Sequence, residues 1–540
     1  MKKILIGSIG TCVHAAGIYN FSKIAEKEGY IVEYLGSSNP IDKIIGAIIE
    51  FQPQIVSISY RLSSDGVRKL LNELDEKLNN NNLKDRIFIF GGTIETSAVA
   101  LEFDFISKIF DGSEEKEESI MFLRNQDKKN IDEKMPQTLR ERVEFKKPFP
   151  LIRHHIGLDT IEETAEHIKI LAESKLLDVI SIAPDQNCQQ HYFDQKEMDH
   201  NEDGAGGTPI RNTDDLLKLY SASKFGNFPL VRCYTGTTNV KEFSKILKDN
   251  INNAWAAIPI TWYSELDRRS ERDLLDAIIE NQNAIKWNAE NNVPVETNES
   301  HQWALRYCSD VIEVTTAFLG AYNAKALGVK DYVMQFMLSN PPSISPKMDI
   351  AKMVAKIEMI QELENDYFKM IRMVRTGLLA YPADPDAAKG LIASTMFYGA
   401  YLKPDIIHAV SYTEAIKRAT SKEIIETVKI IKKSFSLASQ GLPDFLADKE
   451  IYDRKEELKK EARVLLDAMS EMGNHLEDPL SDAEVIYNSI KLGILDAPGL
   501  KGFSVAQGKF STEILDGKHV SVDKDGKVIT EKERLKLLGL

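Results

Sequence analysis

The stretch that decides the fold stands near the amino terminus, where Lys3-Ile4-Leu5-Ile6-Gly7 leads into Gly10-Thr11-Cys12-Val13-His14-Ala15-Ala16-Gly17 and then into an amphipathic segment. The apolar run has the length of one buried strand, and the residues after Gly17 have helical spacing. His14 is therefore expected on a loop at the carboxyl end of a first strand. Open α/β sheets bind their ligands at this edge.

Two later runs fit the same half-domain. Ile55-Val56-Ser57-Ile58-Ser59 is typical of a buried strand, and Ile87-Phe88-Ile89-Phe90-Gly91-Gly92-Thr93 ends in paired glycines that let a ligand approach the backbone. Short apolar runs alternate with amphipathic segments such as 17–28 and 64–79. This alternation predicts a doubly wound, Rossmann-like parallel sheet over residues 1–112.

These segments resemble the cobalamin-binding domain of the mutase and methionine synthase group, whose pattern is Asp-x-His-x-x-Gly, then Ser-x-Leu, then Gly-Gly. The resemblance implies that His14 binds the cobalt of cobalamin as its lower ligand. It also implies that the slot for the tail of the cofactor is formed by the matching positions Gly17, Ser59, Gly91 and Gly92.

Two positions differ from the family pattern. Cys12 stands where the family has the aspartate that hydrogen-bonds the histidine, and Arg61 stands where it has leucine, with Leu62 beside it. A thiol is only a weak hydrogen-bond partner, whereas such partners fix the tautomer and basicity of a metal-binding imidazole. Two alternatives stay open: His14 binds cobalt through a less polarised ring, or the lower ligand is missing and the motif is vestigial.

Composition excludes several other classes. The chain has 540 residues, 43% hydrophobic and 28% charged, which is ordinary for a globular protein of about three domains. The net charge of −14 argues against nucleic acid and anionic membranes as partners, and no apolar run is long enough to span a bilayer. The scattered Cys12, Cys188, Cys233 and Cys308 suggest neither a disulfide framework nor a zinc site, so a cytoplasmic location is expected.

The rest of the chain divides by pattern. Residues 113–147 are rich in Glu and Lys and predict a charged linker. Strand and helix patterns then alternate over residues 148–440. The expected strands are 150–153, 178–183, 229–233, 256–260, 293–296, 310–315, 332–336 and 405–409, with a long helix expected at 349–376. Eight such units predict a (β/α)8 barrel, whose active site would lie at the carboxyl ends of its strands.

The last part of the chain, residues 441–540, predicts a small α+β extension. Residues 450–472 have the pattern of a charged helix, and residues 500–540 are β-rich, with turn signals at Asp516-Gly517 and Asp525-Gly526.

Residues 150–540 resemble the catalytic epsilon subunit of glutamate mutase (methylaspartate mutase). The blocks that carry the resemblance are Leu230-Val231-Arg232-Cys233-Tyr234-Thr235-Gly236, Val293-Pro294-Val295-Glu296-Thr297-Asn298-Glu299, Ala321-Tyr322-Asn323-Ala324-Lys325-Ala326-Leu327-Gly328-Val329-Lys330 and Ile494-Leu495-Asp496-Ala497-Pro498. In that family a separate small subunit carries the cobalamin domain. The resemblance implies a carbon-skeleton mutase, a radical isomerase that uses adenosylcobalamin.

The same resemblance implies a substrate site. Arg153 and Arg232 match two of three arginines that hold substrate carboxylates, and the third position is Gln189. Ala254 stands where the family has the glutamate that binds the substrate amino group. Glu414 matches a glutamate that contacts the adenosyl ribose. We therefore expect a small carboxylic or amino acid as substrate, and not glutamate itself.

Several alternatives stay open at this point. Arg153 and Arg232 could instead balance barrel acids such as Asp159 or Glu299. The chain could be a corrinoid-dependent methyltransferase, or a non-catalytic cobalamin carrier or sensor. No lysine stands out as the Schiff-base residue of an aminomutase that also uses pyridoxal phosphate. The barrel could form a homodimer, as its relatives do.

Overall fold

The computed structural model describes residues 2–124, 135–503 and 505–540. The chain forms two compact units, Met1–Lys134 and Met135–Leu540. The expected charged linker at 113–147 lies partly on residues 125–134, which are outside the described residues. Its described parts include two helices with buried faces, α5 (Lys116–Arg124), which buries Leu123, and α6 (Leu139–Lys146), which buries Leu139 and Val143.

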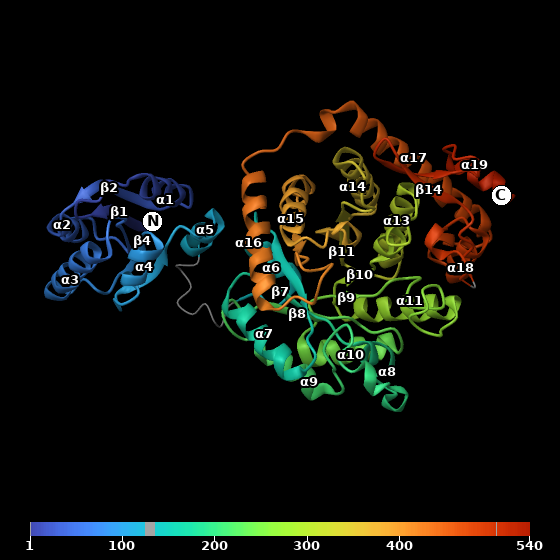
Figure 1. The fold of residues 1–540 in the computed structure, drawn as a ribbon, viewed down its shortest axis with the longest axis horizontal. Helices are drawn as coiled ribbons and strands as arrows, with labels where there is room; N and C mark the ends of the chain where they lie inside the picture. The colour runs from blue at the N-terminus through green and yellow to red at the C-terminus, as the bar shows by residue number, and fades with distance from the viewer. Residues whose placement is uncertain (1, 125–134, 504) are drawn as a thin grey trace. The chain divides into compact units, whose positions relative to one another are not determined.

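The amino-terminal unit is a parallel sheet of five strands in the order β2-β1-β3-β4-β5, with helices on both faces (Figure 1). The strands are β1 (Lys3–Ile9), β2 (Ile31–Asn39), β3 (Ile55–Ser59), β4 (Ile87–Gly91) and β5 (Ile106–Phe110). The remaining helices are α1 (Ala16–Lys27), α2 (Ile41–Phe51), α3 (Ser64–Asn80) and α4 (Ile94–Ala100).

Alternate residues of the central strands supply two cores. Leu5 of β1 packs in the cluster that α2 and α3 cover, whereas Ile4 and Ile6 pack in the cluster that contains Ile18 of α1. Successive side chains of a strand point to opposite faces, so a strand covered on both sides is apolar throughout. The predicted doubly wound sheet is confirmed.

The second unit is built on a nearly closed parallel barrel of eight strands in the order β8-β7-β6-β13-β12-β11-β10-β9. The strands are β6 (Leu151–Ile156), β7 (Val179–Ile182), β8 (Leu230–Cys233), β9 (Ala256–Ala257), β10 (Val295–Glu296), β11 (Asp331–Leu338), β12 (Lys369–Thr376) and β13 (Ile406–His408). The gap between β8 and β9 is bridged by bonds from Ala254 N to the Val231 oxygen (2.9 Å) and from Cys233 N to Asn253 Oδ1 (3.1 Å).

Helices follow the strands around the barrel (Figure 1). They are α7 (Ile161–Glu173), α8 (Gln186–His191), α9 (Thr213–Ala222), α10 (Val240–Ile251), α11 (Leu274–Glu290), α12 (Glu299–Ala304), α13 (Asp310–Ala326), α14 (Pro346–Gln361), α15 (Pro385–Gly399) and α16 (Ser421–Ala438). The predicted (β/α)8 architecture is confirmed.

Two element predictions were wrong. The strand expected at 310–315 is the start of α13, because Ser309 caps a helix that is buried on nearly every side and so lacks an amphipathic period. The helix expected at 349–376 ends at Gln361. A turn at Asn365, whose Oδ1 accepts bonds from the amides of Tyr367 and Phe368, separates it from β12.

An apolar layer closes the amino ends of the barrel strands. Residues of six strands pack together there with Trp255 and with Leu139 and Val143 of α6. The strand members of this layer are Leu151, Val179, Leu230, Val333, Ile371, Met373 and Ile406. Polar side chains of the barrel interior therefore lie toward the carboxyl ends of the strands.

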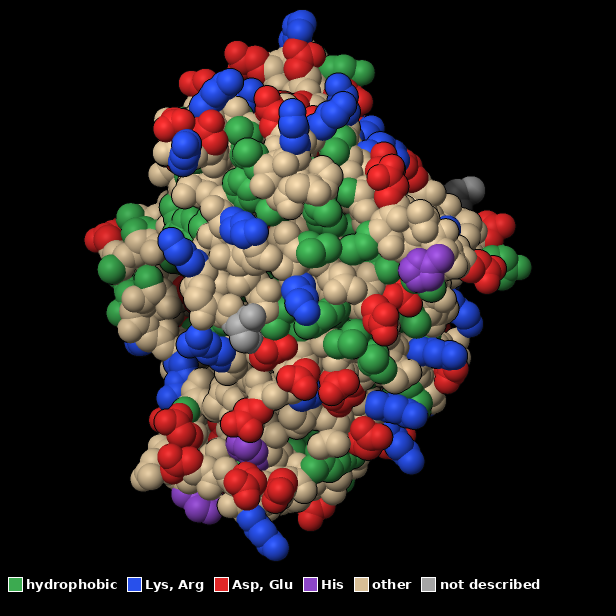
Figure 2. Space-filling view, turned by 90° about the vertical axis from the view of Figure 1, so that its right-hand side faces the viewer, with side chains coloured by type: hydrophobic (Ala, Val, Ile, Leu, Met, Phe, Trp, Pro, Cys, Tyr) green, Lys and Arg blue, Asp and Glu red, His purple; other side chains and the backbone are tan. Residues whose placement is uncertain are grey.

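The carboxyl-terminal part adds the helices α17 (Lys449–Met472), α18 (Ala483–Leu492) and α19 (Glu531–Leu538) and the antiparallel hairpin β14 (Ser511–Leu515) to β15 (Lys518–Val522). Asp516 and Gly517 form the hairpin turn, both with positive φ, as the predicted turn requires. No helix of the described residues is long and apolar enough to cross a membrane. Acidic and basic side chains alternate over the face shown in Figure 2, which is typical of a solvated surface.

Candidate functional site

The loop between β1 and α1 carries His14 at the carboxyl edge of the first sheet. His14 is exposed, whereas Cys12 is fully buried, and its sulfur lies 3.6 Å from Nδ1 of the His14 ring. This contact occupies one ring nitrogen and leaves Nε2 available to a ligand. A thiol thus stands at the place where a metal-binding histidine commonly has a carboxylate partner.

A pocket of about 210 Å³ opens at the same edge, between β3, β4 and α1. It brings together Gly17, Ser59, Gly91 and Gly92, the four positions that the sequence assigned to one slot. The other residues that line it are Ile18, Phe21, Ser57, Arg61, Ile89, Phe110, Gly112, Glu114 and Ser119. Nothing lies within 4 Å of a Cβ placed on Gly17, so this wall is open to a ligand.

The pocket and the loop fit the tail and the lower face of a cobalamin. Walls with both apolar and hydroxyl groups can bind the flat base and the sugar phosphate of the cofactor tail. The exposed imidazole of His14, three residues before Gly17, can bind cobalt. Arg61, which the sequence marked as a departure from the family pattern, also lines this pocket, whereas Phe110 and Glu114 were not among the predicted positions. Phe110 is the last residue of β5 and Glu114 follows that strand, and only the sheet order β4-β5 brings them to the slot.

In the second unit, one row of polar residues runs around the inside of the barrel. Register pairs Arg375 of β12 with His408 of β13, His408 with Arg153 of β6, and Ser181 of β7 with Arg232 of β8. Side chains at paired positions of parallel strands point to the same face. Between β6 and β7 the register pairs Arg153 with Val179 of the apolar layer and Ser181 with His155, so the row continues there through the hydrogen bond from Arg153 to Ser181.

Arg153 is bonded within this row. Its Nη1 donates to Ser181 Oγ at 2.8 Å, and its Nη2 lies 2.7 Å from Nδ1 of His408. Desolvation, followed by the charge of Arg232, lowers the pKa of Arg153 to about 9. Two buried guanidinium groups thus repel each other at the level of the site, which favours the binding of an anion.

Arg232 is the side chain with the most unsatisfied donors among the described residues. It is buried, and its Nε, Nη1 and Nη2 atoms have no hydrogen-bond partner. Its guanidinium carbon lies 4.9 Å from the ring centres of both Tyr234 and Trp255. The nearest carboxylate, Glu296, approaches only to 3.9 Å, and its Oε2 already accepts a bond from Trp255 Nε1 at 2.7 Å.

A chain of neutral side chains links the arginines to the opposite wall. His155 Nδ1 lies 3.2 Å from His408 Nε2, His408 Nδ1 lies 3.1 Å from Gln335 Oε1, and Gln335 Nε2 lies 2.9 Å from His301 Nδ1. Desolvation, with the nearby arginines, holds the pKa of each of these three histidines well below its ordinary value. The network is uncharged at neutral pH, so it adds hydrogen-bonding groups without adding charge.

The other expected residues of the barrel site form no hydrogen bond with the arginines of this row among the described residues. Gln189 is in α8, where its Nε2 donates to the oxygen of Pro184 at 2.9 Å, and the described residues show no hydrogen bond from it to either arginine. Ala254 is buried in the apolar layer. Glu414 lies on the loop after β13, where desolvation raises its pKa and the nearby charge of Arg375 partly offsets that rise.

The acids that could have balanced the arginines are engaged elsewhere. Glu299 accepts bonds from the amide of Ile260 at 2.8 Å and from Trp303 Nε1 at 3.0 Å. Asp159 forms an ion pair with Arg418 at 2.5 Å. Neither acid pairs with Arg153 or Arg232.

Five residues of the interior were not predicted: Arg375, His408, Gln335, His301 and Trp255. Arg375 and His408 lie near the carboxyl ends of strands, where the active sites of such barrels are found. Reading Lys369–Thr376 as a strand would have found Arg375. Because this segment was assigned to a helix, Arg375 was not recognised as a residue of the barrel interior.

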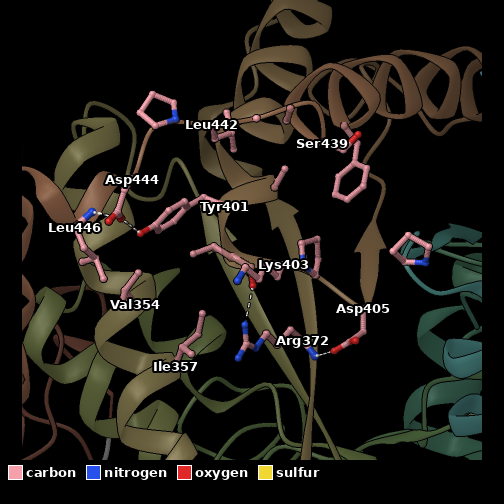
Figure 3. Close-up of a pocket in the computed structure, with 18 of the residues that line it drawn as sticks. Val354, Ile357, Arg372, Tyr401, Lys403, Asp405, Ser439, Leu442, Asp444 and Leu446 are labelled. Carbon is pink, nitrogen blue, oxygen red and sulfur yellow. Dashed lines mark hydrogen bonds between the residues drawn. The ribbon is translucent and has the colours of Figure 1, made fainter. Parts of the chain in front are cut away.

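A larger hollow of about 920 Å³ lies at the other end of the barrel (Figure 3). It is lined by residues near the amino ends of β12 and β13, including Arg372 and Asp405, and by Tyr401 and Leu442. Two of its polar groups are already bonded: Arg372 Nη1 donates to the oxygen of Leu402 at 3.1 Å, and the Tyr401 hydroxyl donates to Asp444 at 2.8 Å. We therefore place the chemistry at the carboxyl ends.

Comparison with known proteins matches one family to the amino-terminal unit and another to part of the second unit. Residues 2–115 match the B12 binding domain family, and residues 275–522 match the methylaspartate mutase E chain (MutE) family. A curated relative, the β subunit of D-ornithine 4,5-aminomutase from Acetoanaerobium sticklandii, is 31% identical over 106 residues, which cover 18% of this chain and 14% of the relative. The match thus spans a small part of that relative's length.

Two solved structures were also matched. A cobalamin-binding protein from Desulfitobacterium hafniense DCB-2 is 25% identical with a TM-score of 0.19, covering 20% of this chain and 52% of that one. The cobalamin-dependent S-adenosylmethionine radical enzyme OxsB is 11% identical with a TM-score of 0.17, covering 100% of this chain and 79% of that one. By its family matches, the chain is thus similar to the B12 binding domain family over residues 2–115 and to the methylaspartate mutase E chain family over residues 275–522.

Proposed function

We propose that this chain is an adenosylcobalamin-dependent isomerase, a carbon-skeleton mutase that acts on a small carboxylic acid. The single observation that supports it most is Arg232, a buried guanidinium with three unpartnered nitrogens inside a barrel related to mutases. A buried cation without partners is costly, and a carboxylate matches its planar fork. The substrate carboxylate is the partner that this side chain lacks.

The amino-terminal unit holds the cofactor in this proposal. His14 would hold cobalt through Nε2, Cys12 would fix the ring through Nδ1, and Ser59, Gly91 and Gly92 would border the tail. When bound, adenosylcobalamin supplies a carbon radical through homolysis of its cobalt–carbon bond.

The barrel binds and orients the substrate. Arg232 binds the carboxylate, and Arg153, held between Ser181 and His408, raises the positive potential at the same level. The rings of Tyr234 and Trp255 exclude water from the guanidinium, which strengthens its pairing with an anion. The neutral histidines offer hydrogen-bonding groups, and the nearest carboxylate, Glu296, approaches Arg232 only to 3.9 Å.

The cofactor half is tested by His14→Ala. Cob(II)alamin bound to the wild-type chain is expected to show electron spin resonance lines that are split by one nitrogen of the protein. Labelling of histidine with ¹⁵N should change this splitting. In His14→Ala this dependence on the label is lost. A label effect that persists in the variant would refute the assignment of His14.

The substrate half is tested by Arg232→Met, which keeps the length of the side chain and removes the fork. Small carboxylic acids are screened for an organic radical signal with the adenosylcobalamin-loaded protein. The variant should take up cofactor normally and lose the substrate-dependent signal by about 100-fold or more. Arg463→Met, an exposed arginine of α17, is the matched control. Cofactor uptake without any substrate-dependent signal in the wild type would instead indicate a carrier.

A further inference from the structure

His155 of β6 has one ring nitrogen that is buried without a partner. The residue stands two positions beyond Arg153 on the same strand, so the two side chains point to the same face and His155 lies nearer the carboxyl end. Its Nδ1 lies 3.2 Å from Nε2 of His408, whereas its Nε2 has no hydrogen-bond partner among the described residues. A buried polar atom of this kind costs free energy until a ligand pairs with it.

The amide of Gln335 assigns the protons of the two histidines. Gln335 Nε2 lies 3.1 Å from Asn298 Oδ1, an oxygen that can only accept, so the other end of the amide, Oε1, faces His408. Oε1 then accepts from Nδ1–H of His408 at 3.1 Å, and Nε2 of His408 accepts from Nδ1–H of His155. Arg153 Nη2 lies 2.7 Å from Nδ1 and 3.1 Å from Nε2 of His408 and does not distinguish these nitrogens. Nε2 of His155 is therefore an acceptor without a donor.

This acceptor lies beside the free donors of Arg232. Both groups contact Tyr234: the His155 ring stacks on the tyrosine ring, with centres 5.2 Å apart and planes 11° apart, and the guanidinium carbon of Arg232 lies 4.9 Å from the same ring centre. The three side-chain nitrogens of Arg232 have no hydrogen-bond partner. One aromatic ring thus borders a set of donors that fits a carboxylate and a single acceptor that fits a neighbouring donor group.

The charges around His155 decide which donor fits its Nε2. Desolvation, with the positive charges of Arg153, Arg232 and Arg375, holds the pKa of His155 well below its ordinary value. Glu296 lies 3.9 Å from Arg232 and makes no contact with His155 among the described residues. These guanidinium groups would repel an ammonium group at Nε2, whereas a hydroxyl group donates the same bond without charge.

We propose that His155 is a specificity-determining residue, which accepts a hydrogen bond from a hydroxyl group of the substrate through Nε2 while Arg232 binds the carboxylate. The substrate is then a small hydroxycarboxylic acid and not an amino acid. This inference rests on the proposed function, since it assigns a second group of the same substrate.

The experiment uses the full chain and measures by calorimetry the binding of butyrate, 2-hydroxybutyrate, 3-hydroxybutyrate and the two matching aminobutyrates. These acids share one carbon chain and differ in the group that would face His155. Wild type is expected to bind one of the hydroxy acids at least about tenfold more tightly than butyrate and than the matching amino acid. Equal affinities for the hydroxy acids and butyrate, or tighter binding of an amino acid, would overturn the proposal.

Two variants of His155 separate binding from folding. Asparagine places its amide near Nδ1 of the imidazole, so His155→Asn keeps a donor for His408 and removes Nε2. The ratio of the affinity for the hydroxy acid to that for butyrate should then fall to about one. Glutamine places its amide near Nε2, so His155→Gln should retain a preference of about threefold or more.

His475→Asn, at an exposed histidine, is the matched control and should keep the wild-type ratio. A preference that persists in His155→Asn would contradict the role of Nε2. Loss of the preference in both His155→Asn and His155→Gln would indicate a structural role and would also count against the proposal.

The outcome is separable from that of the proposed function. A preference for the hydroxy acid that depends on Nε2 supports the role of His155 even if no organic radical forms with adenosylcobalamin, a result that would count against the isomerase alone. A radical that forms with butyrate, at equal affinities for all the acids, would support the isomerase and overturn the role of His155.

Discussion

The sulfur of Cys12 lies 3.6 Å from Nδ1 of His14, so the residue that supports the candidate cobalt ligand is a thiol and not a carboxylate. The thiol polarises the ring weakly, because sulfur is a poor hydrogen-bond donor and acceptor. Both alternatives from the sequence, a weakened ligand and a vestigial motif, depend on this contact. The geometry favours the weakened ligand, since the ring is still held at Nδ1.

Replacement of Cys12 by aspartate is therefore expected to strengthen cobalt binding. A carboxylate at this position would accept the Nδ1 proton and raise the basicity of Nε2, with an increase in cobalamin affinity of about tenfold. Absorbance titration with hydroxocobalamin measures this change. Cys12→Ser, of similar size and without the charge, is the control and should stay near wild type. An affinity for Cys12→Asp equal to that of Cys12→Ser would contradict the role of this contact.

At the scale of elements, the turn from β4 into α4 combines two glycines with different tasks. A Cβ on Gly92 would lie 2.4 Å from Thr96 Oγ1 and 2.6 Å from Phe90, whereas a Cβ on Gly91 meets nothing closer than Ser59 at 3.8 Å. Gly92 is needed for packing of the helix start. The absence of a side chain at Gly91 matters only for a ligand in the pocket beside Ser59.

The pair of variants Gly91→Ala and Gly92→Ala separates these tasks. Gly92→Ala should destabilise the amino-terminal unit by about 1–3 kcal/mol, because the methyl group overpacks the turn. Gly91→Ala should change stability by less than about 0.5 kcal/mol yet weaken cobalamin binding about tenfold. Hydrogen exchange of strand amides reports stability, and absorbance titration reports binding. Tight binding in Gly91→Ala would show that the pocket is not the cofactor slot.

The elements of the barrel show why the substrate site was only partly predictable. Arg153 and Arg232 stand on strands with clear apolar runs and were found. Arg375 stands on β12, Lys-Met-Ile-Arg-Met-Val-Arg-Thr, whose apolar residues continue the spacing of the preceding helix. The local sequence pattern did not separate the helix α14 from the strand β12. The turn at Asn365 that divides them depends on hydrogen bonds that only the folded chain forms.

At the scale of the whole molecule, the barrel buries several neutral histidines. Desolvation lowers the pKa of His154 from an ordinary value of 6.5 to about 4. Between these two pH values the unfolded chain binds more protons than the folded chain. The stability of the barrel is therefore complete above pH 6.5 and falls as pH drops through about 4.

This dependence predicts that acid weakens the barrel unit. His154 alone should lower its free energy of unfolding by about 3 kcal/mol between neutral pH and pH 4, and His154→Leu should remove that part of the loss. Tryptophan fluorescence in urea is a selective readout, because all four tryptophans, Trp255, Trp262, Trp287 and Trp303, lie in the second unit. Identical pH dependence in wild type and His154→Leu would show that His154 carries no such linkage.

The sequence by itself determined the class of both units, the doubly wound sheet and the eight-stranded barrel, and it selected Gly17, Ser59, Gly91 and Gly92 as one set. Strand periodicity, glycine pairs and loop positions are local properties of the chain, so they can be recognised from the sequence alone. Only the tertiary structure decided that Arg375, His408 and Gln335 join Arg153 and Arg232 in one row. Barrel closure and strand register bring together residues far apart in sequence, and burial then leaves the side chain of Arg232 without a hydrogen-bond partner.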